Sequence, residues 1–154
     1  DVCFDYSKES YAALARTLGS IDSLYEIYFD LQYDMIQALR PFVVGHFDLI
    51  RIFDPHYRER LKKASINKKI IRNLELIKDS DLILDFNLRA LAKGAEEPYI
   101  TGSVLRTARE MEINIAPGDD SHGVADVGNY FDRGIEILKE YGFSLKWPFP
   151  KIPA

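Results

Sequence analysis

A short acidic turn near the end of the chain contains the residue types that most often bind metal ions. The segment from Pro117 to Gly123 reads Pro-Gly-Asp-Asp-Ser-His-Gly. Asp120 and His122 are two residues apart, and alternate side chains of an extended segment point to the same side. A carboxylate and an imidazole so placed can both reach one cation, and they suit Zn²⁺, Mn²⁺ or Fe²⁺. A simpler alternative is that Asp119, Asp120 and Ser121 cap the helix expected to follow them.

A second motif with the same pattern lies earlier in the chain. Residues 42–48 read Phe-Val-Val-Gly-His-Phe-Asp, so a short β-branched run ends in His46 and Asp48. Taken alone, this segment is typical of a turn with a hydrogen-bonded histidine. Two apolar runs that both end in histidine and aspartate favour instead one site built from both motifs.

The apolar pattern predicts alternating helices and strands around these motifs. Apolar periodicity together with capping and helix-breaking residues predicts two sets of elements. Helices are expected over residues 7–18, 22–39, 66–77, 103–111 and 126–141, and strands over residues 42–45, 82–87 and 113–116. The helix over 22–39 is expected to bury a face made of Leu24, Ile27, Tyr28, Leu31, Met35 and Ala38. The charged residues between 46 and 64 are expected to form a solvated loop or short helix. This alternation indicates an α/β fold with parallel strands, of which three make only part of a sheet or barrel.

Parallel strands would bring the motif residues to one edge of the sheet. Their carboxyl ends lie on the same side, so one group of side chains is expected to converge if the strands share a barrel. The group comprises His46 and Asp48, Asp85 and Asn87, and Asp119, Asp120 and His122. Asp85 and Asn87 alone are more often turn formers than site residues.

Composition excludes several classes of protein. The chain has 154 residues, 47% hydrophobic residues and a net charge of −4, which fits one globular domain and gives no basic surface for nucleic acid. No apolar run is long enough to span a bilayer, so neither a membrane nor a nucleic-acid partner is expected. The single cysteine, Cys3, is expected to be buried and suits a reducing, cytoplasmic setting. Because the chain starts at Asp1, we expect it to be processed or to be a piece of a longer protein.

An ordered set of motifs resembles one known family. The set comprises Val43–Leu49, Asp85-Phe86-Asn87 with Leu88-Arg89, Glu96-Glu97-Pro98-Tyr99, and Gly118–Val124 with Val127-Gly128. Together they resemble the C-terminal half of histidinol-phosphate phosphatases of the PHP (polymerase and histidinol phosphatase) family, most closely the fungal enzymes. The likeness extends over nearly the whole chain, from the helix at 22–39 through Tyr141.

The resemblance implies a fold and an activity. The fold would be the C-terminal part of a distorted (β/α)7 PHP barrel, with parallel strands and flanking helices. Residues 1–154 would form a single partial domain without the N-terminal barrel strands, and residues 142–154 an irregular tail. The activity would be metal-dependent hydrolysis of L-histidinol phosphate, a small-molecule phosphate ester, to histidinol and phosphate in histidine biosynthesis. A separate N-terminal half-barrel would then be a partner.

The resemblance also implies roles for particular residues. His46, Asp120 and His122 would be metal ligands at a trinuclear centre of Zn, Mn or Fe, and Asp48 would orient His46. Asn87 and Arg89 would line the substrate pocket. No side chain would act as the nucleophile, because metal-bound hydroxide would do so. The family's remaining ligands, a His-x-His pair, a bridging glutamate and a further histidine, lie upstream of this segment.

Two alternatives to this activity stay open from the sequence. The chain could belong to another PHP phosphoesterase that acts on a different phosphate ester or on nucleic-acid ends, although the acidic composition disfavours nucleic acid. The chain could also be an inactive or partner-dependent half-barrel, because it lacks the upstream ligands.

Overall fold

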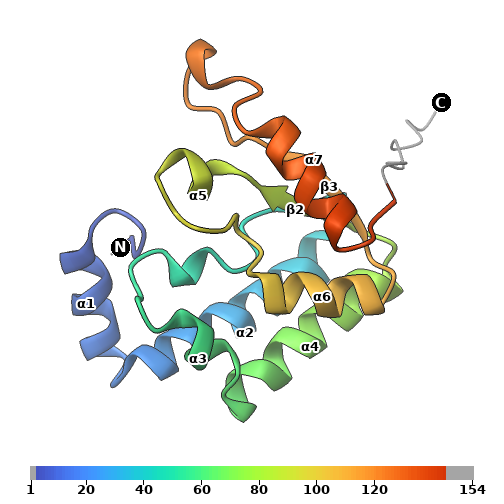
Figure 1. Cartoon of the computed structure of the whole chain (residues 1–154). Coiled ribbons are helices and arrows are strands. Elements are labelled where there is room, and N and C mark those ends of the chain that lie inside the picture. Colours follow the sequence, from blue (N-terminus) through green and yellow to red (C-terminus); the bar gives the residue numbers. More distant parts are fainter. Residues whose placement is uncertain (1–2, 145–154) are drawn as a thin grey trace. The chain divides into compact units, whose positions relative to one another are not determined.

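The computed structural model describes residues 3–144, which form two compact units (Figure 1). Among the described residues, the first unit contains residues 3–40 and 48–76, and the second contains residues 41–47 and 77–144. Helix α4 (Ala64–Asp79) begins in the first unit and ends in the second. Of the predicted irregular tail, residues 142–144 lie in no helix or strand, and residues 145–154 are outside the described part.

The first unit is helical. It contains α1 (Lys8–Thr17), α2 (Ile21–Leu39), the 3₁₀ turn η1 (Leu49–Arg51), α3 (Tyr57–Leu61) and most of α4. Serine side chains cap the N-termini of the first two helices. Ser7 Oγ accepts a hydrogen bond from the backbone N–H of Ser10 at 3.1 Å, and Ser20 Oγ accepts one from the backbone N–H of Ser23 at 2.9 Å. The helices predicted over 7–18 and 22–39 are therefore confirmed. Cys3, which we expected to be buried, is exposed.

The buried face of α2 differs from the predicted one. The buried side chains are Leu24, Tyr25, Phe29, Gln32 and Ile36, whereas Leu31 is 64% exposed. Of the predicted face, Leu24 is buried and Tyr28 and Met35 are half-buried, so the prediction was wrong for the exposed residues Ile27, Leu31 and Ala38. Apolar residues surround most of α2, so helical periodicity alone allows more than one inward face, and here the large rings of Tyr25 and Phe29 are the ones buried.

A buried carboxylate ties together three segments of the first unit. Asp54 is 4% exposed, and its Oδ2 accepts from the Tyr25 hydroxyl at 3.1 Å and from Arg60 Nε at 2.5 Å. Its Oδ1 accepts from the backbone N–H of His56 at 3.0 Å. The expectation that the charged run between 46 and 64 is solvated was therefore wrong for Asp54. The sequence could not show this, because the partner hydroxyl comes from α2.

A second carboxylate of the first unit should make stability depend on pH. Hydrogen bonds from Lys63 and Arg60 hold the pKa of Asp22 below its ordinary value. A lowered folded-state pKa gives stabilisation that is present above the unfolded pKa of about 3.9 and is lost as the pH falls through the folded pKa. We expect Asp22→Asn to lower stability by about 0.5–1 kcal/mol at pH 7. Thermal unfolding at pH 7 and pH 3 checks this, because the difference from the wild type should shrink at pH 3; an equal difference at both would contradict it.

The second unit contains a parallel three-stranded sheet. Its strands are β1 (Val43–Val44), β2 (Ile83–Asn87) and β3 (Asn114–Gly118), in the order β1-β2-β3. The short helix α5 (Arg89–Ala92) and helix α6 (Gly102–Glu110) lie between β2 and β3 in the chain. The 3₁₀ turn η2 (Val124–Asp126) and helix α7 (Phe131–Glu140) follow β3. The predicted combination of helices with a parallel sheet is confirmed.

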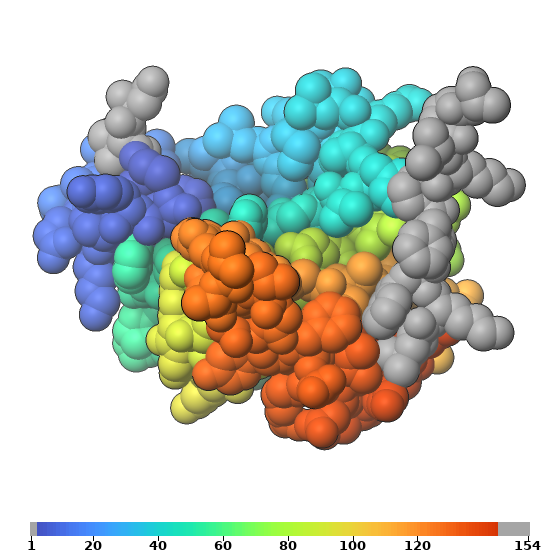
Figure 2. Space-filling model, turned by 90° about the horizontal axis from the view of Figure 1, so that it is seen from above, coloured from blue at the N-terminus to red at the C-terminus, as the bar shows by residue number. Residues whose placement is uncertain are grey.

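Helix α7 begins later than predicted. The sequence pattern suggested a start at residue 126, but α7 starts at Phe131. Gly128 and Tyr130 have φ angles of 77° and 61°, and these left-handed conformations interrupt a right-handed helix. The segment between β3 and α7 is therefore a long exposed loop, drawn in orange in Figure 2.

No helix within residues 3–144 is both long enough and apolar enough to span a lipid bilayer.

Candidate functional site

The buried amide of Asn87, the last residue of β2, lies where side chains from the carboxyl ends of three strands meet. Its Nδ2 is 3.4 Å from Nδ1 of His46, 3.4 Å from Oδ2 of Asp85 and 3.1 Å from Oδ2 of Asp120. Its Oδ1 accepts from the backbone N–H of Arg89 at 2.9 Å, which fixes the orientation of the amide. The expectation that His46, Asn87 and Asp120 converge is confirmed.

The parallel register produces this convergence. Val44 is paired with Leu84, and Asn87 is paired with Gly118. The residues just beyond β1 and β3 therefore lie on either side of the carboxyl end of β2. If β1 or β3 ran antiparallel to β2, the residues that follow that strand would lie at the opposite end of the sheet.

Asp85 is a member of this cluster that the turn interpretation misjudged. Asp85 and Asn87 both lie within β2, where residues two apart point to the same face. The pKa of the Asp85 carboxyl is raised to about 6, mainly by burial and to a smaller extent by the charges of Asp120 and Asp119, against the lowering effects of Asn87 and His46. The available sequence signal was the period of two, Asp-x-Asn, along a strand.

Two glycines leave space for the Asp85 carboxylate. A Cβ atom on Gly118 would overlap Asp85 Oδ1 and press against its Cγ, whereas one on Gly45 would lie at an ordinary 3.8 Å from Oδ2. Gly118 is thus required for the close approach of the β2 carboxylate to the end of β3. Gly45 only borders the same space.

Two of the predicted ligands have an unusual backbone conformation. His46 and Asp120 have φ angles of 54° and 50°. Positive φ is uncommon outside glycine, and such residues often occur at functional sites. His46 directly follows Gly45, and Asp120 lies two residues after Gly118.

The loop after β3 is closed by the Asp119 side chain rather than capped onto a helix. Asp119 Oδ2 accepts from the backbone N–H of Gly128 at 2.5 Å, and Oδ1 accepts from that of Ser121 at 3.3 Å. The hydrogen bond from Gly128 is the main reason that the pKa of Asp119 lies below its ordinary value. The alternative that residues 119–121 cap the next α-helix was therefore wrong, because α7 begins only at Phe131.

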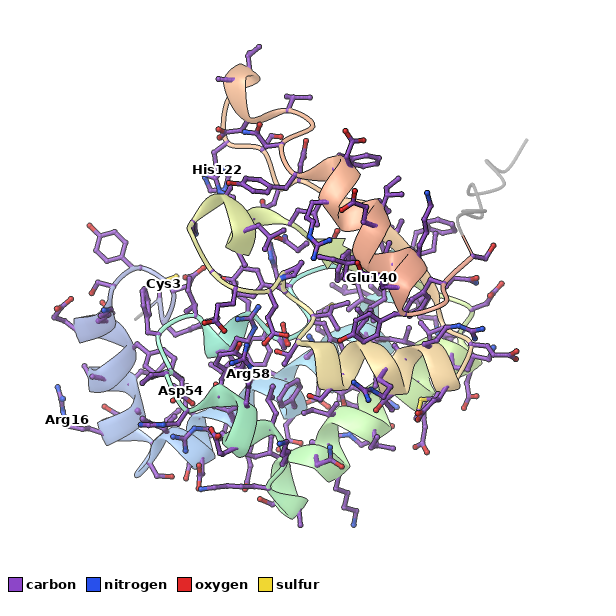
Figure 3. All side chains as sticks on the ribbon, in the orientation of Figure 1. Cys3, Arg16, Asp54, Arg58, His122 and Glu140 are labelled. Carbon is purple, nitrogen blue, oxygen red and sulfur yellow. The ribbon has the colours of Figure 1, made fainter. Side chains whose placement is uncertain are left out.

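His122 extends from this loop into solvent. Its Nε2 lies 3.6 Å from Asp120 Oδ1, and its side chain is 61% exposed. Figure 3 labels His122 on the loop between β3 and α7. The two side chains therefore lie close to each other, and their role as a ligand pair stays a prediction.

Arg89 and Asp48 have partners that the motif did not indicate. Arg89 Nη1 donates to Asp126 Oδ2 at 2.9 Å, while its Nε is buried and has no hydrogen-bond partner within residues 3–144. Asp48 belongs to the first unit, where it is fully buried and lies 3.7 Å from Arg51 Nε. The proposed roles of Arg89 toward substrate and of Asp48 toward His46 stay predictions.

The donor atoms are of the right chemical type for divalent transition metals. Imidazole nitrogens of His46 and His122 and the carboxylate of Asp120 suit Zn²⁺, Mn²⁺ and Fe²⁺. Asn87 contacts both His46 and Asp120, and His122 lies beside Asp120. Within the described residues, no three histidine, cysteine, aspartate or glutamate side chains lie close enough together to hold one ion. The chemistry of the donor set therefore fits a metal centre whose ligand number this segment does not complete, and the ligand assignment stays a prediction.

Comparison with known proteins gives one consistent result. The chain is 34% identical over 143 residues to a Schizosaccharomyces pombe protein named probable histidinol-phosphatase, covering 91% of this chain and 47% of that protein. It is 30% identical to the histidinol-phosphatase of Saccharomyces cerevisiae, over 69% of this chain and 38% of that protein. With the Bacillus subtilis histidinol-phosphatase the identity is 29%, over 88% and 52%. No family model matches the chain.

A solved structure agrees with these relatives. The crystal structure of a candidate histidinol phosphatase from Listeria monocytogenes superposes with a TM-score of 0.75 and 27% sequence identity. The match covers 84% of this chain and 51% of that chain. The resemblance to histidinol-phosphatases inferred from the motifs is confirmed, and the chain is a homologue of these enzymes that spans about half of their length.

Proposed function

We propose that this chain is part of a histidinol-phosphatase, which hydrolyses L-histidinol phosphate to histidinol and phosphate. The observation that carries the proposal is the convergence of His46, Asn87 and Asp120 at the carboxyl ends of three parallel strands, in a chain homologous to these enzymes. The substrate would be a small phosphate ester. The same convergence is compatible with hydrolysis of another phosphate ester, so substrate comparison is part of the test.

We further propose that the fold is the C-terminal part of a distorted (β/α)7 PHP barrel. Its support is the parallel order β1-β2-β3 together with coverage of about half of each relative. Residues 1–154 would then form one partial domain, and the strands that complete the barrel would come from additional sequence or from a partner chain. Such strands would also bring the further ligands that His46, Asp120 and His122 need.

The residues of this chain would have different roles at a metal centre. His46, Asp120 and His122 would hold divalent ions of the Zn, Mn or Fe class, with Asp48 orienting His46. Bound divalent ions supply Lewis-acid stabilisation of phosphoryl oxygens. Asn87 would line the substrate pocket. The buried Nε–H of Arg89 would donate a hydrogen bond to a phosphoryl oxygen of the substrate. Arg89 Nη1, by contrast, is already committed to Asp126.

The central test replaces one predicted ligand in the full-length protein. We expect His122→Ala to lose bound metal and to lose phosphatase activity by more than about 100-fold together, because the ligand and the activity depend on the same ions. Metal content by elemental analysis and phosphate release from histidinol phosphate measure the two effects. His56→Ala is the matched control, because His56 is exposed at the start of α3 in the first unit, and it should retain both.

Three outcomes would contradict parts of this proposal. Retained metal with lost activity in His122→Ala would indicate a direct proton-transfer role for His122 instead of metal ligation. Faster hydrolysis of other phosphate esters than of histidinol phosphate would favour another phosphoesterase activity. Full-length protein without bound metal or activity would favour a half-barrel that depends on a partner.

A further inference from the structure

The loop at residues 119–128, which carries Asp120 and His122, has little buried surface of its own. Val124 is 94% exposed, and the residues from Ser121 to Ala125 are all exposed. A segment with few buried apolar contacts is ordered mainly by its polar contacts and opens at low free-energy cost. The position of His122 therefore depends on the hydrogen bonds and ion pairs that hold this loop.

One carboxylate oxygen connects the loop to the helix that follows β2. Asp126 Oδ2 accepts from Arg89 Nη1 at 2.9 Å and, at 3.4 Å, from the backbone N–H of His122. Arg89 is in turn fixed, because its backbone N–H donates to Asn87 Oδ1. A continuous path of polar contacts thus runs from the buried end of β2, through Arg89 and Asp126, to the backbone of His122.

The Asp119 contacts do not replace this path. Asp119 closes the loop on itself through Ser121 and Gly128, and both of these partners belong to the same loop. The Arg89–Asp126 pair instead joins the loop to α5, a different element of the second unit. The side chain of Arg89 is largely buried, so this pair is less screened by water than a surface pair.

We propose that Asp126 is a positioning residue that ties the loop carrying Asp120 and His122 to Arg89 and so holds His122 in place. The proposal deepens the proposed function, on which it rests for the role of His122. Asp126 touches neither of the side chains assigned to metal binding, and it acts through the backbone of His122 and the guanidinium of Arg89. Residues that orient metal ligands typically contribute about 10- to 100-fold to metal affinity.

The test compares two aspartate substitutions in the whole chain. Asp126→Ala should speed hydrogen exchange of the amides between 119 and 128 by several-fold and weaken binding of Zn²⁺, followed by calorimetric titration, by about 10-fold. Asp132→Ala is the matched control, because Asp132 is an exposed aspartate in the first turn of α7 and its loss makes the same charge change. It should leave both measurements as in the wild type. Circular dichroism confirms that both variants fold.

A double-mutant cycle isolates the tether from general effects. Arg89→Met removes the ion pair to Asp126 but leaves Asp126 as the acceptor of the His122 N–H, so it should speed hydrogen exchange of the loop by no more than Asp126→Ala does. In the double variant, exchange of the loop should be no faster than in Asp126→Ala alone, because Asp126→Ala already removes the ion pair. Unchanged exchange in Asp126→Ala, or additive effects in the double variant, would overturn the proposal. If the wild-type protein binds no Zn²⁺ but the variants still show the expected changes in loop exchange, the result would contradict the metal centre and support the contact between Arg89 and Asp126.

Discussion

Asp54→Ala should lower the free energy of unfolding by about 3–5 kcal/mol, which is the cost of breaking a buried charge pair by removing one partner. Asp54 is almost fully buried and accepts hydrogen bonds from the Tyr25 hydroxyl, Arg60 Nε and the backbone N–H of His56. Without the carboxylate, the largely buried guanidinium of Arg60 loses its ion pair with Asp54 and keeps the one with Asp22. The Tyr25 hydroxyl also loses its acceptor in a buried position. Urea unfolding at pH 7 measures the change.

Asp34→Ala provides the matched control for this effect. Asp34 is an exposed aspartate on α2, and its removal should change stability by less than about 0.5 kcal/mol. The variant Asp54→Ala combined with Arg60→Met should recover part of the loss, since it removes the uncompensated charge. A loss in Asp54→Ala no larger than that in Asp34→Ala would show that the Asp54 network contributes little.

Gly118→Ala should destabilise the protein by about 1–3 kcal/mol, the usual cost of forcing extra atoms into a packed site. Its methyl group would overlap the Asp85 carboxylate, which burial and Asn87 keep in place. Either the carboxylate or the end of β3 must move, and β3 leads directly to Asp120. We therefore also expect the Asn87–Asp120 contact to weaken. Denaturant unfolding and the amide chemical shifts of residues 118–122 measure the two effects.

Gly45→Ala tests whether the crowding at Asp85 is specific to Gly118. Its methyl group would make only ordinary van der Waals contact with the same carboxylate, so we expect the free energy of unfolding to change by no more than about 1 kcal/mol in either direction. Asp85→Ala combined with Gly118→Ala should restore part of the stability lost in Gly118→Ala. Equal losses in Gly45→Ala and Gly118→Ala, with no recovery in the double variant, would contradict the crowding argument.

The sequence located helices and strands well where residue propensities agreed with capping or helix-breaking residues. Ser7 and Ser20 accept the capping hydrogen bonds that begin α1 and α2. The β-branched run Val43–Val44 and the apolar run before Asp85 form neighbouring parallel strands. The gathering of His46, Asn87 and Asp120 followed from this parallel order, since the carboxyl ends of parallel strands lie at one edge.

Other features depended on contacts between residues far apart in the chain. The inward face of α2 was misjudged because most of its circumference is apolar, so periodicity gave no unique direction. The late start of α7 depended on left-handed conformations at Gly128 and Tyr130, where the residue pattern still suggested a helix. The burial of Asp54 depended on Tyr25, 29 residues away.

By itself, the sequence determined the family that the chain resembles, the candidate residues for the chemistry and the strand ends near which they lie. These features rest on residue types, local spacing and the parallel order of strands, which are readable along the chain. The tertiary structure alone decided that Asp85 lies in a space left by glycine, that Asn87 joins His46 to Asp120, and that Asp126 ties Arg89 to the loop of His122. These contacts join residues from different strands and loops, and their distances depend on how the strands pair and the loop closes.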